Sequence, residues 1–268
     1  MTRYLLAIGL VLLTSPASLR ATTIGTSIGV EFGIGGTQGI TSGLNPTDVA
    51  GVVPTANWNI ASGDSGTLAA GSVVEDTNSA GSIAPGVSVS WATGDTWNNN
   101  GTANFANAND NLLNDGYLDG ESGGHGTVTF SGLVPGSLYD VYITSTGGTT
   151  EDKGGNMVVN GVDDHAVFGD DTSGVYVQST ITTPGNYHFF ATTVDDSGDI
   201  SIITGGSDPT SMRIPISSVE LVPIAVVPEP SSLALFGCGA AGLCLAARRR
   251  RRAGSSAKAR RSSLAGLS

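Results

Sequence analysis

The sequence predicts an all-β protein whose central domain is a two-sheet β-sandwich. The chain has 39 glycines among 268 residues without a Gly-X-Y period, and glycine costs about 1 kcal/mol per helical position relative to alanine. Short runs of Val, Ile, Thr and aromatic residues recur between turn residues, and none has the length and period of a long helix. A hydrophobic content of 39% is sufficient for a core.

About a dozen strands are expected in the central domain, which is typical of a sandwich. The predicted strands cover residues 28–32, 49–53, 73–75, 87–92, 126–130, 138–144, 156–159, 165–168, 175–182, 185–191, 199–204 and 217–221. Thr183 and Pro184 separate two of these runs, which are expected to form a hairpin.

Residues 127–143 carry the strongest local pattern, a strand, a turn at Pro135-Gly136 and a second strand with alternating residues. Leu133 is expected to close the edge of the sheet. The spacing from Gly132 to Tyr139 resembles the tyrosine corner of fibronectin-like sandwiches, in which the tyrosine hydroxyl bonds back to the preceding loop. The second strand is expected to place Tyr139, Val141 and Ile143 in the core and Asp140, Tyr142 and Thr144 on the opposite face.

Charge is distributed unevenly along the chain. Residues 22–227 carry 22 acidic residues and two basic ones, Lys153 and Arg213, for a net charge of −20, whereas residues 1–21 carry +2 and residues 228–268 carry +7. An acidic domain of this kind repels phosphate backbones, which excludes nucleic acid as a partner. Both cysteines lie in the C-terminal apolar run, so the central domain, residues 22–222, has no disulfide and no thiolate metal site.

Residues 1–21 are predicted to be a signal peptide. Arg3 precedes the apolar residues 4–13, and small residues follow at 14–18. This apolar run is too short to span a bilayer, which needs about 20 residues. A buried N-terminal helix is the alternative, but glycine-rich β-like sequence begins directly afterwards. Cleavage is expected between Ala17 and Ala21.

The C-terminal end combines three features. A linker at 223–230 ends in the motif Pro228, Glu229 and Pro230; an apolar segment covers 231–247; and five arginines follow, Arg248, Arg249, Arg250, Arg251 and Arg252. The apolar segment has the minimum length of a transmembrane helix. The arginines are expected to keep the basic tail, residues 248–268, in the cytoplasm and the central domain outside. The alternative is a core helix with a solvated basic end.

These three features in order resemble the PEP-CTERM sorting tail of Gram-negative, often biofilm-forming bacteria. The resemblance implies recognition by a membrane-embedded exosortase, a cysteine transpeptidase-like enzyme, with cleavage near Pro228, Glu229 and Pro230. It implies an exported protein that is anchored in the inner membrane as an intermediate and then moved to the cell surface or exopolysaccharide. Residues 253–268 depart from the family pattern, because such tails usually stop at the arginines.

Residues 46–59 and 111–119 resemble segments of other exported PEP-CTERM proteins. That resemblance extends loosely over residues 28–222. It implies a jelly-roll sandwich similar to galactose-binding and other carbohydrate-binding modules, and it brings no catalytic residues. We therefore expect a non-enzymatic surface or matrix protein. The alternatives are a carbohydrate-binding module with a polysaccharide partner and a secreted hydrolase.

No catalytic residue is predicted. Residues 63–66 match the Gly-Asp-Ser-Gly around a trypsin-like nucleophile, but the first histidine, His125, comes after Ser65. That chain order does not fit such an enzyme, which needs its histidine and then its aspartate upstream of the serine. A tight turn explains the four residues.

Two ligand sites are predicted. Asp195, Ser197 and Asp199 have the alternating oxygen donors of a calcium loop, although Ile200 stands where an EF-hand has glycine; solvated acidic turns are the alternative. Trp97 and Tyr117 are candidates for an aromatic platform that stacks on sugar rings, together with Trp58 and Trp91, and core packing is the alternative. No cofactor other than a structural calcium ion is expected.

Overall fold

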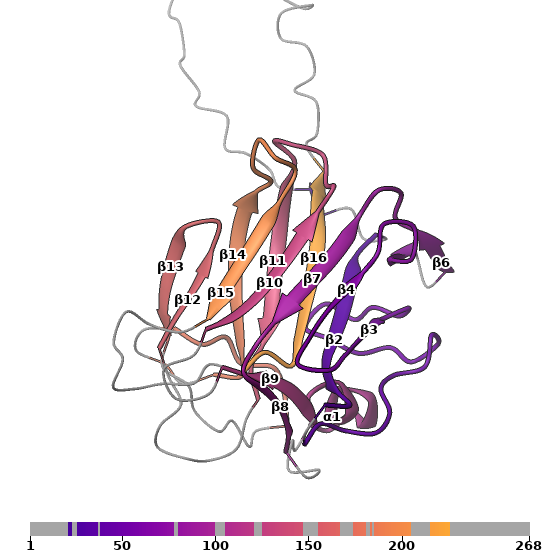
Figure 1. Cartoon of the computed structure of the whole chain (residues 1–268), viewed down its shortest axis with the longest axis vertical. Helices are drawn as coiled ribbons and strands as arrows, with labels where there is room; N and C mark the ends of the chain where they lie inside the picture. The colour runs from indigo at the N-terminus through magenta and orange to yellow at the C-terminus, as the bar shows by residue number, and fades with distance from the viewer. Residues whose placement is uncertain are drawn as a thin grey trace, which may run out of the picture. The chain divides into compact units, whose positions relative to one another are not determined.

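The computed structural model describes residues 21–22, 26–36, 38–77, 80–99, 105–120, 125–146, 155–166, 174–180, 183, 185–204 and 215–225. The chain divides into two units, Met1–Ala225 and Val226–Ser268, and every described residue belongs to the first. The described part is mostly β-sheet, arranged in several sheets with no closed barrel (Figure 1). The prediction of an all-β domain is therefore confirmed.

The first large sheet, called sheet 1, has six strands. Five of them lie in the order β14 (Tyr187–Thr193), β11 (Leu138–Thr144), β16 (Ser218–Ala225), β2 (Ile28–Ile34) and β3 (Asn59–Ser62). The short strand β1 (Ala21–Thr22) pairs with the end of β16. β3 runs parallel to β2, and the other neighbours are antiparallel.

The second large sheet, called sheet 2, is antiparallel throughout. Its order is β13 (Val162–Ala166), β12 (Gly155–Val159), β15 (Ile200–Thr204), β10 (Gly126–Ser131), β7 (Ser88–Ala92) and β4 (Ser65–Leu68). Two further two-stranded sheets are formed by β5 (Val74–Thr77) with β6 (Ala80–Ile83) and by β8 (Asp95–Asn98) with β9 (Gly116–Asp119). The short helix α1 covers Ala108–Leu113.

Four strand pairs are nested inside one another along the chain. From the inside outwards they are β12–β13, β11–β14, β10–β15 and β2–β16. They belong alternately to sheet 2 and sheet 1. The chain therefore folds as one long hairpin whose paired arms alternate between the two sheets.

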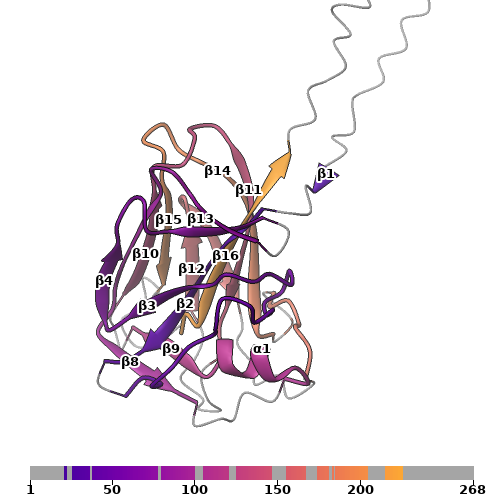
Figure 2. The same cartoon turned by 90° about the vertical axis from the view of Figure 1, so that its right-hand side faces the viewer.

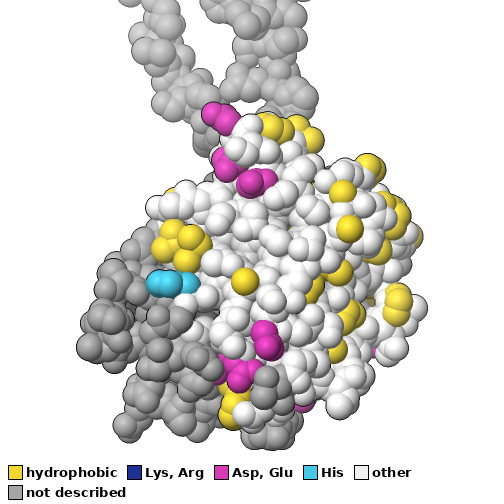
Figure 3. Space-filling view, viewed as in Figure 1, with side chains coloured by type: hydrophobic (Ala, Val, Ile, Leu, Met, Phe, Trp, Pro, Cys, Tyr) yellow, Lys and Arg dark blue, Asp and Glu magenta, His cyan; other side chains and the backbone are white. Residues whose placement is uncertain are grey.

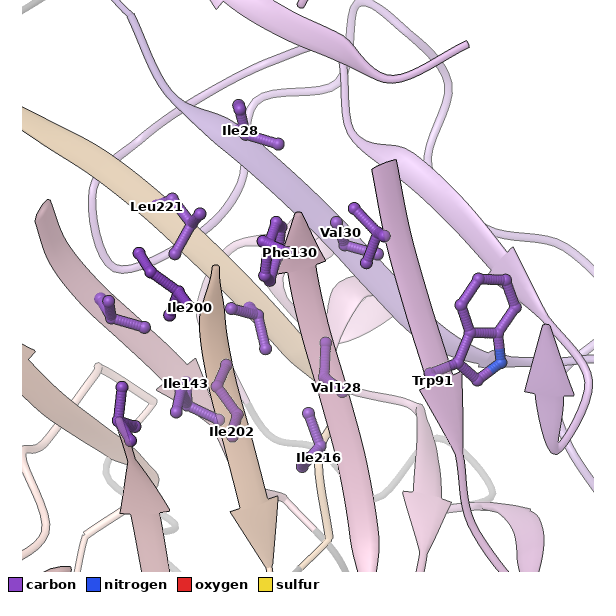
Figure 4. Close-up of a cluster of buried hydrophobic side chains, with 14 of the residues drawn as sticks. Ile28, Val30, Trp91, Val128, Phe130, Ile143, Ile200, Ile202, Ile216 and Leu221 are labelled. Carbon is purple, nitrogen blue, oxygen red and sulfur yellow. The ribbon is translucent and has the colours of Figure 1, made fainter. Parts of the chain in front are cut away.

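The two large sheets share one hydrophobic core. Its members come from the inner faces of both, including Val30, Val141 and Leu221 from sheet 1 and Val128, Phe130 and Ile202 from sheet 2. Figure 4 shows Val30, Leu221, Val128, Phe130 and Ile202 between the strands. Phe32 of β2 packs edge-on against Trp91 of β7, with ring centroids 6.1 Å apart. Burial of this continuous apolar surface is the main force that holds the two sheets together.

The strand with the strongest sequence pattern matches its prediction residue for residue, since β11 covers Leu138–Thr144. Val141 and Ile143 are 0% exposed, and Tyr139 packs against the core, as expected from the alternation. Leu133 is also in the core. The Tyr139 hydroxyl has no hydrogen bond to the preceding turn within the described residues, so the tyrosine-corner resemblance does not extend to that bond.

Two predicted strands are wrong. Residues 51–54 form a turn closed by backbone hydrogen bonds between Ala50 and Thr55. The described residues of the segment 175–182 turn back at Thr180 and Thr183 and make only isolated bridges to Thr183 and Tyr187, so no regular hairpin ladder forms there. The side chain of Asn186 bonds the backbone of Val175 and Val177 at 2.9 Å each, which holds this segment in an irregular path.

Both predicted terminal segments lie outside the described residues, apart from Ala21, which is part of β1. No helix among the residues that the structure describes is long and apolar enough to cross a membrane. The predicted transmembrane helix at 231–247 and the basic tail at 248–268 are not among them. β16 continues to Ala225, so residues 223–225 belong to the last strand and not to the predicted linker.

Candidate functional site

The outer face of sheet 1 is the face of that sheet turned away from the shared core. Strand alternation places on it the outward-pointing residues of four neighbouring strands. These residues are Tyr187 and Phe189 of β14, Asp140, Tyr142 and Thr144 of β11, Ser218 and Glu220 of β16, and Gly29 and Glu31 of β2. The register puts Tyr142 directly between Phe189 and Glu220.

Residues 41–58, called the covering loop, lie with α1 over the half of this face formed by β2 and β16. A second hydrophobic cluster forms there from Leu44, Ala50, Trp58 and Leu113. The Trp58 ring lies against Gly29, where a Cβ atom would come within 2.6 Å of the ring. Trp58 is therefore a packing residue and not part of an exposed platform. Figure 2 shows α1 on the side of the domain away from β4.

Two carboxylates lie buried beneath the covering loop. Glu31 is 0% exposed and Glu220 is 1% exposed. Glu31 Oε2 accepts the Leu44 N–H at 2.9 Å, and Glu220 Oε2 accepts the Val53 N–H at 3.3 Å. The Oε1 atom of each carboxylate has no hydrogen-bond partner among the described residues. β2 and β16 are therefore each joined to the covering loop by one hydrogen bond, from a backbone N–H of the loop to a glutamate side chain.

Burial changes the protonation of both acids. It raises the pKa of Glu31 to about 7, with the Leu44 N–H lowering that pKa and Asp48 raising it. Burial also raises the pKa of Glu220 well above its ordinary value, against the lowering effect of the Val53 N–H. Both carboxyl groups therefore hold a proton at higher pH than an exposed glutamate does.

Aromatic side chains follow one another over the other half of the face, formed by β11 and β14. Tyr142 lies 5.3 Å from Phe189 and 6.2 Å from Tyr187 between ring centroids, and Tyr187 lies 6.3 Å from Tyr176. Phe105 continues the series, 4.7 Å from Tyr176. We call these five residues the aromatic strip. Tyr142, Tyr187 and Phe189 are half-buried, so part of each ring is open to solvent.

A hydrogen-bonded network joins the strip to the covering loop. The Tyr176 hydroxyl donates to Asp110 Oδ1 at 3.0 Å and accepts from Asn114 Nδ2 at 3.1 Å. The same Asp110 oxygen accepts the Gly51 N–H at 2.9 Å. α1 supplies Asp110, and Asn114 follows directly as its C-cap. The network fixes the position of Tyr176, between Tyr187 and Phe105 in the strip.

The two residues predicted to bind sugar, Trp97 and Tyr117, are brought together by the structure. They are direct cross-strand partners in the β8–β9 sheet. Tyr117 is only 4% exposed, however, and Trp97 is half-buried. Trp91 is a core residue, and its indole N–H donates to the Gly63 carbonyl at 3.0 Å. Of the four predicted platform aromatics, only Trp97 has substantial solvent access.

The predicted calcium residues lie in an exposed turn before β15. Asp195 Oδ1 accepts the N–H groups of Ser197 and Asp199 at 2.9 and 2.8 Å, so this oxygen already caps the turn. Within the described ranges, no three His, Cys, Asp or Glu side chains are grouped to hold a metal ion. Calcium binding here stays a prediction, which thermal melting in calcium against chelator tests.

Sequence reasoning missed the aromatic strip and the buried acids. Tyr187 and Phe189 alternate in β14, and Tyr142 was expected on the non-core face, so alternation of aromatics was an available signal. A single acid inside an apolar strand, such as Glu31 in β2, gives no sequence sign of its depth. The covering loop buries both acids. For Glu220 that loop is distant in sequence, so no local pattern indicates its burial.

The class of the protein follows from the fold and from the segment after it: an all-β domain whose last core strand leads directly into a sorting signal. A family model for the PEP-CTERM protein-sorting motif matches residues 226–251, which include the predicted residues Pro228, Glu229, Pro230, Arg248, Arg249, Arg250 and Arg251. The chain is a PEP-CTERM domain-containing protein. The motif marks it as exported and sorted to the cell surface by an exosortase-type enzyme. These sorting residues lie outside the described residues.

Comparison with other proteins adds little beyond the motif. No curated protein matches the chain. The ANXUR2 extracellular domain from Arabidopsis thaliana is 13% identical, with a TM-score of 0.30 over 43% of this chain and 34% of that one. The plant receptor-like kinase ANX2 is 11% identical, with a TM-score of 0.37 over 65% and 56%. The chain thus spans between a third and just over half of these solved chains, and neither similarity carries an argument about function.

Proposed function

We propose that this chain is a non-enzymatic protein of the cell surface or exopolysaccharide matrix, cut near Pro228, Glu229 and Pro230 by an exosortase. One observation carries the proposal. β16 ends at Ala225 and the sorting motif begins at residue 226. Cleavage at the Pro-Glu-Pro motif therefore leaves every described strand intact, and a complete domain is delivered.

In this proposal the membrane-anchored form is an intermediate. Residues 231–247 span the inner membrane, and Arg248, Arg249, Arg250, Arg251 and Arg252 remain in the cytoplasm with the basic tail that ends at residue 268. The arginine cluster supports this orientation through the positive-inside rule. The signal peptide at 1–21 directs the domain to the opposite side.

Mass spectrometry of the mature C-terminus tests the processing step. The chain is expressed in a host with an active exosortase and in the same host without it. We expect a C-terminus near residues 228–230 only when the exosortase is present, and Glu229→Ala should reduce that processing. Asp196→Asn, an exposed change in the acidic turn, is the matched control. Full-length chain in the cytosol with its leader attached would contradict the proposal.

The fold proposed for the domain is a jelly roll of the galactose-binding-like type. The nested pairs that alternate between sheet 1 and sheet 2 support it. The non-enzymatic assignment is supported by the position of the two acids with raised pKa, because Glu31 and Glu220 are enclosed by the covering loop and have no access to a substrate. Hydrolysis of polysaccharides by the purified protein would contradict it.

A second candidate function, carbohydrate binding by the same exported domain, is favoured by a specific observation. The aromatic strip leaves three half-buried rings on an outer sheet face, and aromatic rings on such faces can stack on the apolar faces of sugars. Retention of the purified chain on polysaccharide columns, compared with an uncharged resin, tests this function.

A further inference from the structure

We propose that the aromatic strip, and not the Trp97–Tyr117 pair, is the binding site for an uncharged glycan chain. The inference rests on the second candidate function above and deepens it by locating the site and naming the ligand class. The strip lies on the outer face of sheet 1, over β11 and β14.

The arrangement of the rings favours an extended ligand. Tyr142 and Phe189 are direct cross-strand neighbours, and Tyr187 lies diagonally from Tyr142. Tyr142 is tilted by 47° relative to Phe189 and by 44° relative to Tyr187, so the rings form a row along a sheet and do not enclose a cage. A row of partly open rings matches successive sugar units, whose ring C–H groups form apolar patches.

Polar groups beside the rings suit sugar hydroxyls. Asp140 lies on the same face of β11 as Tyr142, two residues before it. Glu220, opposite Tyr142 on β16, is enclosed by the covering loop and is not one of these groups. The Tyr142 and Tyr187 hydroxyls can donate or accept. Carboxyl and phenol groups next to aromatic rings supply the few polar contacts that orient a bound sugar.

The charge of the domain selects against anionic glycans. Within the described ranges there is no Lys or Arg, and the central region as a whole has only Lys153 and Arg213 against 22 acids. Figure 3 shows the opposite face of the domain, over sheet 2, where acidic side chains are scattered and no Lys or Arg appears among the coloured residues. A uronate polymer would meet like charge at the strip, whereas an uncharged glycan meets no such repulsion.

The competing site is less suitable for stacking. Tyr117 is 4% exposed, so Trp97 is the one ring of that pair with access to a ligand. The exposed aliphatic residues Val134, Val162 and Val175 belong to separate segments and carry no ring. The aromatic strip is therefore the surface on which several rings can contact one chain.

Calorimetric titration of the full-length chain, in a detergent without a sugar headgroup, tests the proposal. The probes are oligosaccharides of β-1,4-glucan, β-1,3-glucan and β-1,4-mannan, with alginate oligosaccharides as the anionic counterpart. We expect at least one uncharged probe to bind and alginate not to bind. Tyr142→Ala and Phe189→Ala should each weaken that binding about tenfold or more, the loss of one stacked ring.

Three further variants keep the test interpretable. Tyr142→Phe and Phe189→Leu preserve much of the packing and cover the case in which an alanine variant fails to fold. Tyr142→Phe also preserves the ring, so it should keep most of the affinity. Trp97→Ala should bind like the wild type. Loss of binding in Trp97→Ala but not in Tyr142→Ala and Phe189→Ala would overturn the site while leaving carbohydrate binding in place. Absence of binding to every uncharged probe would overturn both, and tight binding of alginate would overturn the ligand class.

Discussion

The buried acid Glu31 makes the stability of the domain fall as the pH rises. Its pKa is about 7 in the folded chain against an ordinary value of 4.5, so the folded state keeps a proton that the unfolded state has released. The stabilising contribution is complete below about pH 4.5 and is lost as the pH rises through about 7. A difference of about 2.5 pKa units corresponds to about 3 kcal/mol, or about 1.4 kcal/mol per pH unit between these values.

The perturbation is Glu31→Gln, which keeps an oxygen to accept the Leu44 N–H but removes the titration. Glu220, whose pKa is also raised by burial, gives a slope of the same sign that remains in the variant. We therefore expect the free energy of unfolding to fall with pH in both proteins. The slope should be about 1.4 kcal/mol per pH unit smaller in the variant over pH 5–7.

The assay is urea denaturation of residues 21–225 at several pH values and constant ionic strength. Asp196→Asn, which changes an exposed residue in the turn before β15, is the matched control. The reasoning is refuted if the wild type becomes more stable between pH 5 and pH 7, or if Glu31→Gln leaves the slope unchanged.

Four other predictions concern stability, measured by chemical or thermal denaturation. Gly132→Ala should destabilise the domain more than Gly136→Ala. Both glycines have a positive φ, near +80° and +78°, but only at Gly132 would a Cβ atom clash, 2.1 Å from a carbonyl oxygen. Equal losses of stability would contradict this. Phe130→Ala should cost about 3–5 kcal/mol, since the side chain is 0% exposed. Added sodium chloride should raise the melting temperature, because salt screens repulsion among uncompensated acids; a fall would argue against that repulsion. Residues 21–225 should fold cooperatively, whereas 21–217 should not, because the shorter chain lacks β16.

Local patterns predicted the strands whose side chains alternate between a core and an outer face. β11 was found in full because Tyr139, Val141 and Ile143 alternate with polar or half-buried positions. Strands of four residues with few apolar groups were missed, including β4 and β6, since their pairing partners define them. α1 was also missed, because six residues rich in Asn and Asp give no helical period.

The wrong strand at 49–53 shows why distant contacts limit such predictions. Three valines and an alanine suggest a strand, yet the Gly51 and Val53 N–H groups bond Asp110 and Glu220. These partners are 59 and 167 residues away in sequence. The candidate site was predictable only in part. The outer position of Tyr142 follows from the local alternation of the strand. The positions of Tyr176 in the aromatic strip and of Glu220 next to it follow from the fold. The sorting motif depends only on local order, and its presence was predicted from the sequence.

β16 connects the sorting of this protein with its folding. The strand lies between β11 and β2, contributes Val219 and Leu221 to the core, and places Glu220 under the covering loop. Until residue 225 has been exported, β11 and β2 face each other with unpaired edges, which invite pairing with other chains. Because the sorting motif begins at the next residue, the last core strand is complete before the chain reaches the motif, and a chain cut at the motif keeps the strand that closes these edges.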